Sequence, residues 1–153
     1  MAESEVETGE LSPEALEALL AQPLIARMGT VSRGERPHVV PVWFLWEGGS
    51  LWICAFRSTR KVRDLERNPH LSVLVDVAES GVDFRAVLFE GRAELVTQPP
   101  GLVQEISTRI YTRYLGEAGA QAPDPQSWIH DPENLLIRLA PEKTYTWYSA
   151  GKE

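Results

Sequence analysis

The sequence has a single cysteine, Cys54, so no disulfide can form within the chain. A chain of this kind is typical of a reducing compartment, and we expect a cytoplasmic protein. Long hydrophobic runs are also missing: stretches such as Val39 to Trp46 are far shorter than the roughly 20 residues that cross a bilayer, so we expect no membrane partner. The first ten residues hold four acids and no basic residue, which predicts no secretory signal and a flexible acidic tail over residues 1–10.

An excess of positive charge is absent as well. The formal net charge of −7 argues against nucleic acid as a partner. The three histidines have no ligand spacing to one another or to Cys54, so we predict no metal site, and Cys54 itself is expected to be a buried, inert thiol. Four of the fifteen basic residues nevertheless fall between Arg57 and Arg63, with no acid among them. Such a cluster on an acidic protein indicates a small anionic ligand.

The remaining composition is that of one ordinary soluble domain, which we place at residues 11–153. Apolar segments separated by turn residues predict about seven strands and three helices, an order typical of an antiparallel barrel with peripheral helices. Residues 116–131 are rich in glycine and proline and are expected to be irregular. The predicted strands are 24–32, 38–46, 51–56, 71–77, 84–96 (with a bulge at Gly91), 133–139 and 143–149, and the predicted helices begin at Pro13, at Arg60 (ending at Arg67) and at Pro99 (ending near Leu115).

Two of the predicted strands do not alternate between apolar and polar residues, as half-exposed antiparallel strands do. Val39 to Trp46 and Leu51 to Phe56 are apolar almost throughout, so both faces of each must be covered. The barrel interior covers one face, and a second subunit, a helix of the same chain or a flat ligand covers the other. Because a bare apolar edge promotes aggregation, we predict a homodimer whose interface includes both strands.

The basic cluster lies where the third predicted strand passes into a helix. Arg60 and Lys61 in the first helical turn oppose the helix dipole, and a bound anion would remove that conflict. The hydroxyls of Ser58 and Thr59, the free backbone N–H groups and the fixed cations, Arg57 included, together form a set of groups that binds phosphate. The alternative is a solvated basic turn that is paired with neighbouring acids.

The segment from Phe56 to Asp76 resembles the pyridoxamine 5'-phosphate oxidase-like superfamily. In that superfamily a Ser-Arg-Lys sequence follows a barrel strand and precedes a helix that ends in Asn-Pro or Asp-Pro. Here Arg60-Lys61 is followed by Asp64 to Pro69, and upstream Gly34 to Phe44 is similar to a G-x-P-h-x-x-P-V-W-F strand of the same superfamily.

The resemblance implies a split β-barrel, mainly β with peripheral helices and six or seven antiparallel strands in a Greek-key-like order. It also implies a flavin-type cofactor and the residues that bind it. The basic segment would hold the cofactor phosphate and the upstream strand would lie against its ring: these residues are Arg57, Ser58, Thr59, Arg60 and Lys61, and Pro41, Val42 and Trp43, respectively.

Two departures from the family pattern argue against pyridoxamine phosphate as the substrate. The strand Val39 to Trp46 carries none of the phosphate-binding cations that the true oxidases have there, and the C-terminal Arg-x-His motif is missing. The chain is more similar to branches that bind FMN or the deazaflavin coenzyme F-420. The acidic tail of coenzyme F-420 requires a longer cationic groove than the single phosphate of FMN, and Arg57, Arg60, Lys61 and Arg63 could serve either cofactor.

The implied activity is that of a flavin- or deazaflavin-dependent oxidoreductase, with hydride transfer to or from a small organic substrate. No catalytic residue is assigned, because the cofactor itself carries this chemistry. The alternative is a non-catalytic carrier of a flavin or of a tetrapyrrole such as haem. A third interpretation is a structural barrel whose basic turn binds nothing.

Overall fold

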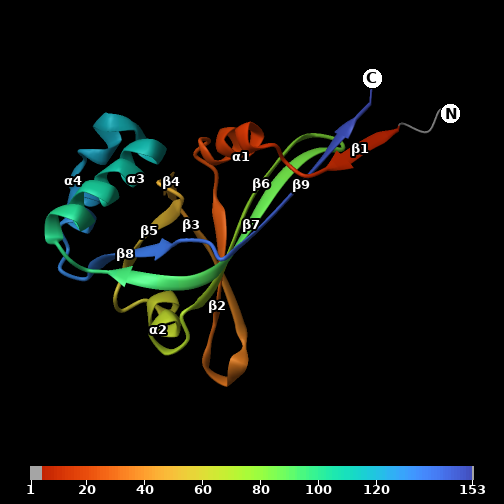
Figure 1. The fold of residues 1–153 in the computed structure, drawn as a ribbon. Helices are drawn as coiled ribbons and strands as arrows, with labels where there is room; N and C mark the ends of the chain where they lie inside the picture. Colours follow the sequence, from red (N-terminus) through yellow and green to blue (C-terminus); the bar gives the residue numbers. More distant parts are fainter. Residues whose placement is uncertain (1–4, 153) are drawn as a thin grey trace.

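Nine strands and four α-helices make up residues 5–152, the part of the chain that the computed structural model describes (Figure 1). The strands are β1 (Val6–Gly9), β2 (Ala26–Val31), β3 (Pro37–Val42), β4 (Leu45–Glu47), β5 (Ser50–Phe56), β6 (His70–Ser80), β7 (Asp83–Val96), β8 (Asn134–Leu139) and β9 (Lys143–Gly151). The helices are α1 (Pro13–Leu20), α2 (Arg60–Arg67), α3 (Pro100–Ala120) and α4 (Pro123–Ile129), and a short 3-10 turn, η1 (Arg33–Glu35), joins β2 to β3. The chain is mainly β with peripheral helices, as predicted.

One antiparallel sheet contains these strands and is not closed. Its order is β3-β2-β6-β7-β8-β5-β4, while β9 pairs with β7 and β1 pairs with β9. Strand β7 joins the two halves of the sheet, because Phe84 to Glu90 pair with β9 and Ala93 to Val96 pair with β8. The split barrel is therefore confirmed, although residues 5–152 form nine strands rather than six or seven.

Local sequence signals correctly predicted where helices α1 and α2 begin. The side chain of Ser12 accepts a hydrogen bond from the backbone N–H of Ala15 and caps α1. Helix α2 has the predicted bounds and Thr59 at its N-cap, but the Thr59 hydroxyl donates to the carbonyl of Phe56 at 2.7 Å and does not cap the helix. The first turn of α2 is thus left without a side-chain acceptor from Thr59. None of the helices within residues 5–152 is long and apolar enough to cross a membrane.

Two apolar clusters form the interior. The larger one lies between the strands and α1, where Leu19 and Leu20 are fully buried. The smaller one lies between α3 and the outer side of β5, where Ile106 and Ile110 pack with Trp52. The second apolar face of β5 is therefore covered by a helix of the same chain, one of the alternatives that its sequence left open.

The predicted strand 38–46 is wrong in one respect, because it is broken after Val42. Phe44 turns into the core and is fully buried, whereas Trp43 points out against α3. The backbone N–H of Phe44 donates to the hydroxyl of Tyr114 at 3.1 Å instead of to a strand. The predicted bulge at Gly91 is also wrong, since Gly91 pairs regularly with Leu71. A side chain at Gly91 would lie 2.9 Å from Leu139, so the glycine allows a close approach.

Two further segments differ from the prediction. Residues 116–131 are largely helical, because α3 continues past a kink at Gly116 (φ 76°) to Ala120 and α4 follows. Glycine and proline thus mark a kink and a helix start there. In the acidic segment 1–10, residues 1–4 lie outside the described residues, and Val6–Gly9 form β1 against β9, an added strand that the sequence did not predict.

One face of the sheet remains uncovered by the described chain. Directly paired residues of an antiparallel sheet lie on the same face, and the row Pro41, Arg27, Leu74, Leu88 and Tyr145 crosses five strands in this way. The opposite face of these strands is in the core. We call this surface the outer sheet face; its apolar members are Val39, Pro41, Leu74, Leu88, Tyr145 and Trp147. Val39 is 62% exposed.

Candidate functional site

A cavity of about 410 Å³ lies where the end of β3, the first turn of α2, and helices α3 and α4 meet. This volume is usual for a small-molecule site. Lys61 is the single charged residue among those that line it. We call it the apolar cavity; its lining residues are Ile25, Pro41, Val42, Trp43, Cys54, Lys61, Ile110, Tyr111 and Trp128.

Aromatic rings form one wall of the apolar cavity. The ring of Trp43 stacks on Tyr114 with centroids 4.7 Å apart and meets the ring of Tyr111 edge-on at 5.9 Å. Trp128 from α4 lies 5.7 Å from Tyr111. The hydroxyl of Tyr114 donates to the carbonyl of Leu24 at 2.6 Å, which ties α3 to the start of β2. The wall is therefore rigid, and it presents flat faces to any ligand.

Burial controls the ionisation of the polar groups in this cavity. Burial lowers the pKa of Lys61, which forms no ion pair within residues 5–152. It raises the pKa of Cys54 to about 12 and the pKa of Tyr111 to about 12. The thiol and the phenol therefore stay protonated and neutral at physiological pH.

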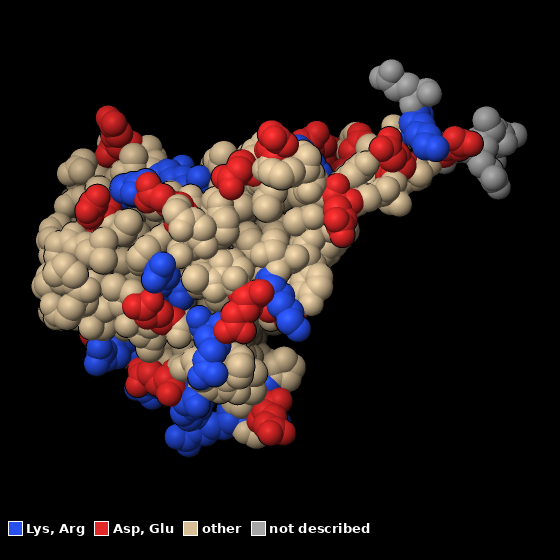
Figure 2. Space-filling model, in the orientation of Figure 1, with Lys and Arg blue, Asp and Glu red and all other residues tan. Residues whose placement is uncertain are grey.

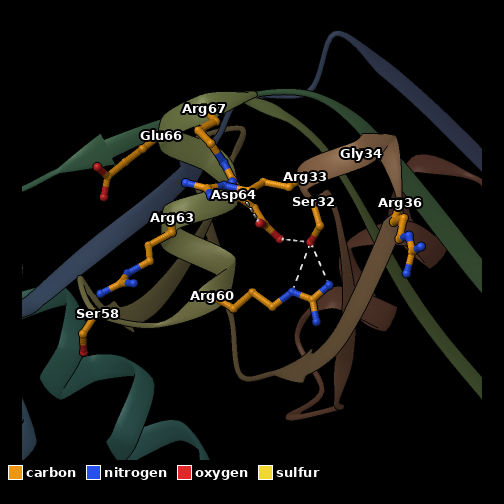
Figure 3. A pocket seen from close by; sticks show the side chains of 10 residues that line it. All are labelled: Ser32, Arg33, Gly34, Arg36, Ser58, Arg60, Arg63, Asp64, Glu66 and Arg67. Carbon is orange, nitrogen blue, oxygen red and sulfur yellow. Dashed lines mark hydrogen bonds and ion pairs between the residues drawn. The ribbon is translucent and has the colours of Figure 1, made fainter.

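A second cavity, of about 970 Å³, lies between α2 and the turn that joins β2 to β3 (Figure 3). We call it the arginine cavity; its lining residues are Ser32, Arg33, Gly34, Arg36, Ser58, Arg60, Arg63, Asp64, Glu66 and Arg67. Lys and Arg side chains gather over this end of the molecule in Figure 2. Within residues 5–152, Arg33, Arg36 and Arg63 form no ion pair, so these charges are available to an anion.

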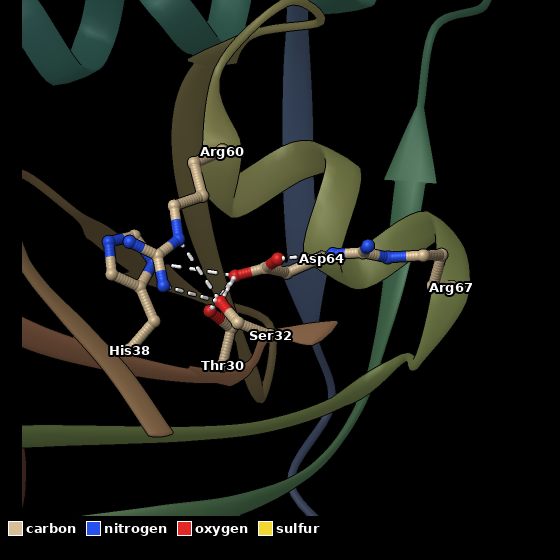
Figure 4. Close-up of polar contacts among 6 residues, drawn as sticks. All are labelled: Thr30, Ser32, His38, Arg60, Asp64 and Arg67. Carbon is tan, nitrogen blue, oxygen red and sulfur yellow. Dashed lines mark hydrogen bonds and ion pairs between the residues drawn. The ribbon is translucent and has the colours of Figure 1, made fainter. Parts of the chain in front are cut away.

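A buried carboxylate joins α2 to the β2–β3 hairpin (Figure 4). Asp64, whose side chain is 1% exposed, accepts hydrogen bonds from Thr30 at 3.0 Å and from Ser32 at 2.7 Å. Its second oxygen accepts from Arg67 at 2.7 Å. Nδ1 of His38 lies 3.4 Å from the first oxygen. Burial alone would raise the pKa of Asp64, but these hydrogen bonds and the Arg67 charge lower it overall.

The depressed pKa of Asp64 predicts a specific pH dependence of stability. A carboxylate whose folded pKa lies below its ordinary value of about 3.9 stabilises the fold above that pH, and this contribution is lost as the pH falls through the folded pKa. We therefore expect Asp64→Asn to lower the free energy of unfolding at neutral pH. The gap between wild type and variant should then narrow below about pH 4. Urea denaturation between pH 3 and pH 7 measures both effects.

Glu94→Gln is the control for this experiment. Glu94 pairs with Arg138 at 3.1 Å, but both side chains are exposed, and exposed pairs contribute about 0–1 kcal/mol. We expect a smaller loss of stability from Glu94→Gln at every pH. Equal losses from the two variants would contradict a special role for the buried carboxylate.

The residues predicted to bind a cofactor are divided between the two cavities. Pro41, Val42, Trp43 and Lys61 line the apolar cavity, whereas Ser58 and Arg60 line the arginine cavity. Thr59 lies at the N-cap of α2 between them. Arg57 is exposed, and its backbone N–H donates to the carbonyl of Glu133 at 3.0 Å. Cofactor binding by these eight residues remains a prediction.

Sequence reasoning missed several residues of these cavities. Tyr111 and Trp128 were not singled out, although the spacing of Ile110 and Tyr114 indicated a helix face with an apolar side. Asp64 was counted as an ordinary partner of the basic turn, yet it lies at the centre of a buried network. Trp147, a further aromatic of the sequence, lies on β9 near Phe84 and lines neither cavity.

Comparison with known proteins extends this picture. A family model described as pyridoxamine 5'-phosphate oxidase matches residues 12–148. No curated protein sequence matches the chain. Solved structures share the fold, among them the following three. A conserved hypothetical protein from Mycobacterium tuberculosis has a TM-score of 0.76 at 19% identity, over 97% of this chain and 88% of that chain. An F420 reductase has a TM-score of 0.66 at 24% identity, over 87% of this chain and 98% of that chain. The haem storage protein of Vibrio cholerae has a TM-score of 0.70 at 19% identity, over 91% of this chain and 96% of that chain.

Proposed function

Because the chain belongs to the pyridoxamine 5'-phosphate oxidase family, we propose that it is an oxidoreductase that uses a flavin or the deazaflavin coenzyme F-420. One observation carries the proposal: the apolar cavity brings the cation Lys61 together with the Pro41–Val42–Trp43 segment. A cation without an ion-pair partner within residues 5–152, in the lining of an aromatic-walled cavity, suits a ligand with a flat ring and an anionic group.

In this proposal the protein binds and orients the cofactor and excludes water. Lys61 would hold the anionic group from the apolar cavity, and Arg60 would contact it from the first turn of α2. The hydroxyls of Ser58 and Thr59, which donate to Glu133 at 2.9 Å and to the carbonyl of Phe56 at 2.7 Å, would turn from these acceptors to the anionic group. A bound flavin or deazaflavin supplies the chemistry, since its ring accepts and returns a hydride. The neutral thiol and phenol of the cavity leave that ring as the reactive group. The substrate would be a small organic molecule.

The arginine cavity favours coenzyme F-420 over FMN. FMN ends in one phosphate, which Lys61 and Arg60 suffice to bind. Arg33, Arg36 and Arg63, which like Arg60 form no ion pair within residues 5–152, would be left over, and they suit an additional acidic tail. They are partly or fully exposed, so their contribution depends on ionic strength.

Titration at two salt concentrations tests this choice of cofactor. We expect the Kd of coenzyme F-420 to rise more steeply with salt than the Kd of FMN, because contacts of a long anion with exposed charges are screened more strongly than contacts of one partly buried phosphate. If FMN binds much more tightly at every salt concentration, the protein is an FMN enzyme. If neither binds, the oxidoreductase proposal fails.

A second candidate is a carrier that binds its ligand without turnover. The similarity to a haem storage protein and the neutral thiol and phenol of the apolar cavity support it. The absorption spectrum of the purified protein separates the two functions. A flavin band that bleaches with a reductant and recovers with an organic acceptor supports the enzyme, whereas a haem Soret band supports the carrier.

We also propose that the protein works as a homodimer in the cytoplasm. The outer sheet face supports a dimer, since it carries exposed Val39, Tyr145 and Trp147 around the partly buried Leu74 and Leu88. The contact would thus involve β3 with β2, β6, β7 and β9, while β5 is covered by α3. The single cysteine suits a reducing compartment.

A further inference from the structure

We propose that Ser32 and Asp64 are positioning residues that orient the guanidinium of Arg60 toward an anionic ligand. The inference rests on the proposed function, because Arg60 is one of the residues proposed to bind the anionic group of the cofactor. It adds Ser32 of the β2–β3 hairpin and Asp64 of α2 to the phosphate-binding segment that the sequence places at Arg57 to Lys61. It is argued from a chain of hydrogen bonds that joins Asp64 of α2 to Ser32 of the hairpin, and Ser32 to Arg60 of α2 (Figure 4).

The direction of each hydrogen bond in this chain is fixed by chemistry. An ionised carboxylate can only accept, so the Ser32 hydroxyl donates its single proton to Asp64 at 2.7 Å. The two lone pairs of the Ser32 oxygen are then free to accept. Nε and Nη2 of Arg60 fill both positions, at 3.1 and 2.9 Å. The hydroxyl is thereby saturated, and Arg60 is held by two bonds rather than one.

The remaining end of Arg60 faces the arginine cavity (Figure 3). Its Nη1 group forms no hydrogen bond within residues 5–152 and keeps two donors for a ligand. An arginine on a flexible stem loses rotamer freedom when it binds an anion, whereas one already held loses little at that step. The contacts with Ser32 thus make Arg60 a better ligand for an anion than its exposure alone suggests.

The charge on Asp64 is essential to this arrangement. Thr30, Ser32 and Arg67 all donate to its two oxygens. An asparagine has one oxygen, which accepts, and one NH2 group, which donates. Its NH2 group would therefore face another donor, either the hydroxyls of Thr30 and Ser32 or the guanidinium of Arg67. A neutral partner would also free the Ser32 proton to rotate, and the bonds to Arg60 would no longer be enforced. A buried ionised carboxylate is costly, which fits a role beyond packing.

A double-mutant cycle on the full chain tests the proposal, with FMN and coenzyme F-420 titrated as probes. We expect Arg60→Ala to weaken binding about tenfold or more and Ser32→Ala to weaken it roughly threefold to tenfold. In the Arg60→Ala background, Ser32→Ala should have no further effect, because its action passes through Arg60. Thr30→Val is the matched control: it also removes one hydroxyl from Asp64 but does not touch Arg60, so affinity should stay at the wild-type value.

A second readout needs no cofactor. The Nε–H resonance of Arg60 should exchange slowly with water in the wild type and in Thr30→Val and rapidly in Ser32→Ala. The positioning role would be overturned if Ser32→Ala kept wild-type affinity and slow exchange while Arg60→Ala bound the cofactor more weakly. The assignment of the anionic group to Arg60 would survive that result. An equal loss from Ser32→Ala in both backgrounds would also overturn the positioning role. Wild-type affinity in Arg60→Ala would overturn it together with the assignment of the anionic group to Arg60.

Discussion

Replacement of Lys61 by alanine is expected to weaken the binding of FMN or coenzyme F-420 by about tenfold to a hundredfold. A charge-assisted hydrogen bond to phosphate is worth about 1.5–3 kcal/mol, and Lys61 is the single cation of the apolar cavity. Burial lowers the pKa of Lys61, so the cavity already disfavours the ammonium, and an anion would compensate for that cost. Fluorescence titration of the apo protein with each cofactor measures the effect.

The same substitution should leave folding intact. Lys61 lies in the first turn of α2, where a cation opposes the helix dipole by about 0.3–1 kcal/mol, so its removal should not lower the free energy of unfolding. Arg92→Ala is the control for the change in net charge, because Arg92 is exposed on β7 and lines neither cavity. Normal cofactor affinity in Lys61→Ala, combined with lost stability, would identify Lys61 as a structural residue instead.

Local sequence signals predicted the parts of the site that depend on neighbours in the chain. Thr59 before a basic turn and Asn68-Pro69 after it gave the bounds of α2, because caps and stops act within a few residues. The Gly48–Gly49 turn between β4 and β5 is likewise a local feature, since both glycines have the positive φ that a short hairpin turn requires. Local signals alone do not place Lys61 beside the end of β3. That placement requires the barrel fold, which was predicted from the family resemblance.

Contacts between segments that are distant in the chain could not be predicted from the sequence. Thr30 and Ser32 are more than thirty positions from Asp64, and nothing in a local pattern shows that a carboxylate on α2 meets hydroxyls at the end of β2. The break in the strand at Trp43 likewise depends on α3, since Tyr114 accepts the Phe44 N–H and stacks on Trp43. An unbroken apolar run therefore predicted an unbroken strand, although tertiary contacts determine where it ends.

The outer sheet face leads to the last prediction, because it connects the proposed dimer to the cofactor. Pro41 belongs both to this face and to the lining of the apolar cavity. A partner seated on the face would therefore reach the mouth of that cavity and exclude water from it. Val39, two residues away and on the same face, is 62% exposed and lines no part of the cavity. It is thus the position at which the dimer can be tested without altering the ligand contacts directly.

Val39→Asp is expected to weaken the dimer by at least about a hundredfold. In the monomer the new carboxylate would be solvated, whereas in the dimer it would be buried without a partner, at a cost of about 2–5 kcal/mol. A two-fold interface contains the substitution twice, which doubles the effect. Sedimentation velocity at micromolar concentration should show a dimer for the wild type and a monomer for Val39→Asp.

Val82→Asp is the matched control, because Val82 is exposed at the β6–β7 turn, away from the outer sheet face, and this variant should stay dimeric. A wild-type monomer, with or without cofactor, would refute the dimer. A dimeric Val39→Asp would place the interface elsewhere on the molecule. If the partner covers the cavity mouth as proposed, the monomeric Val39→Asp should also bind cofactor more weakly than Val82→Asp, although neither residue touches the ligand.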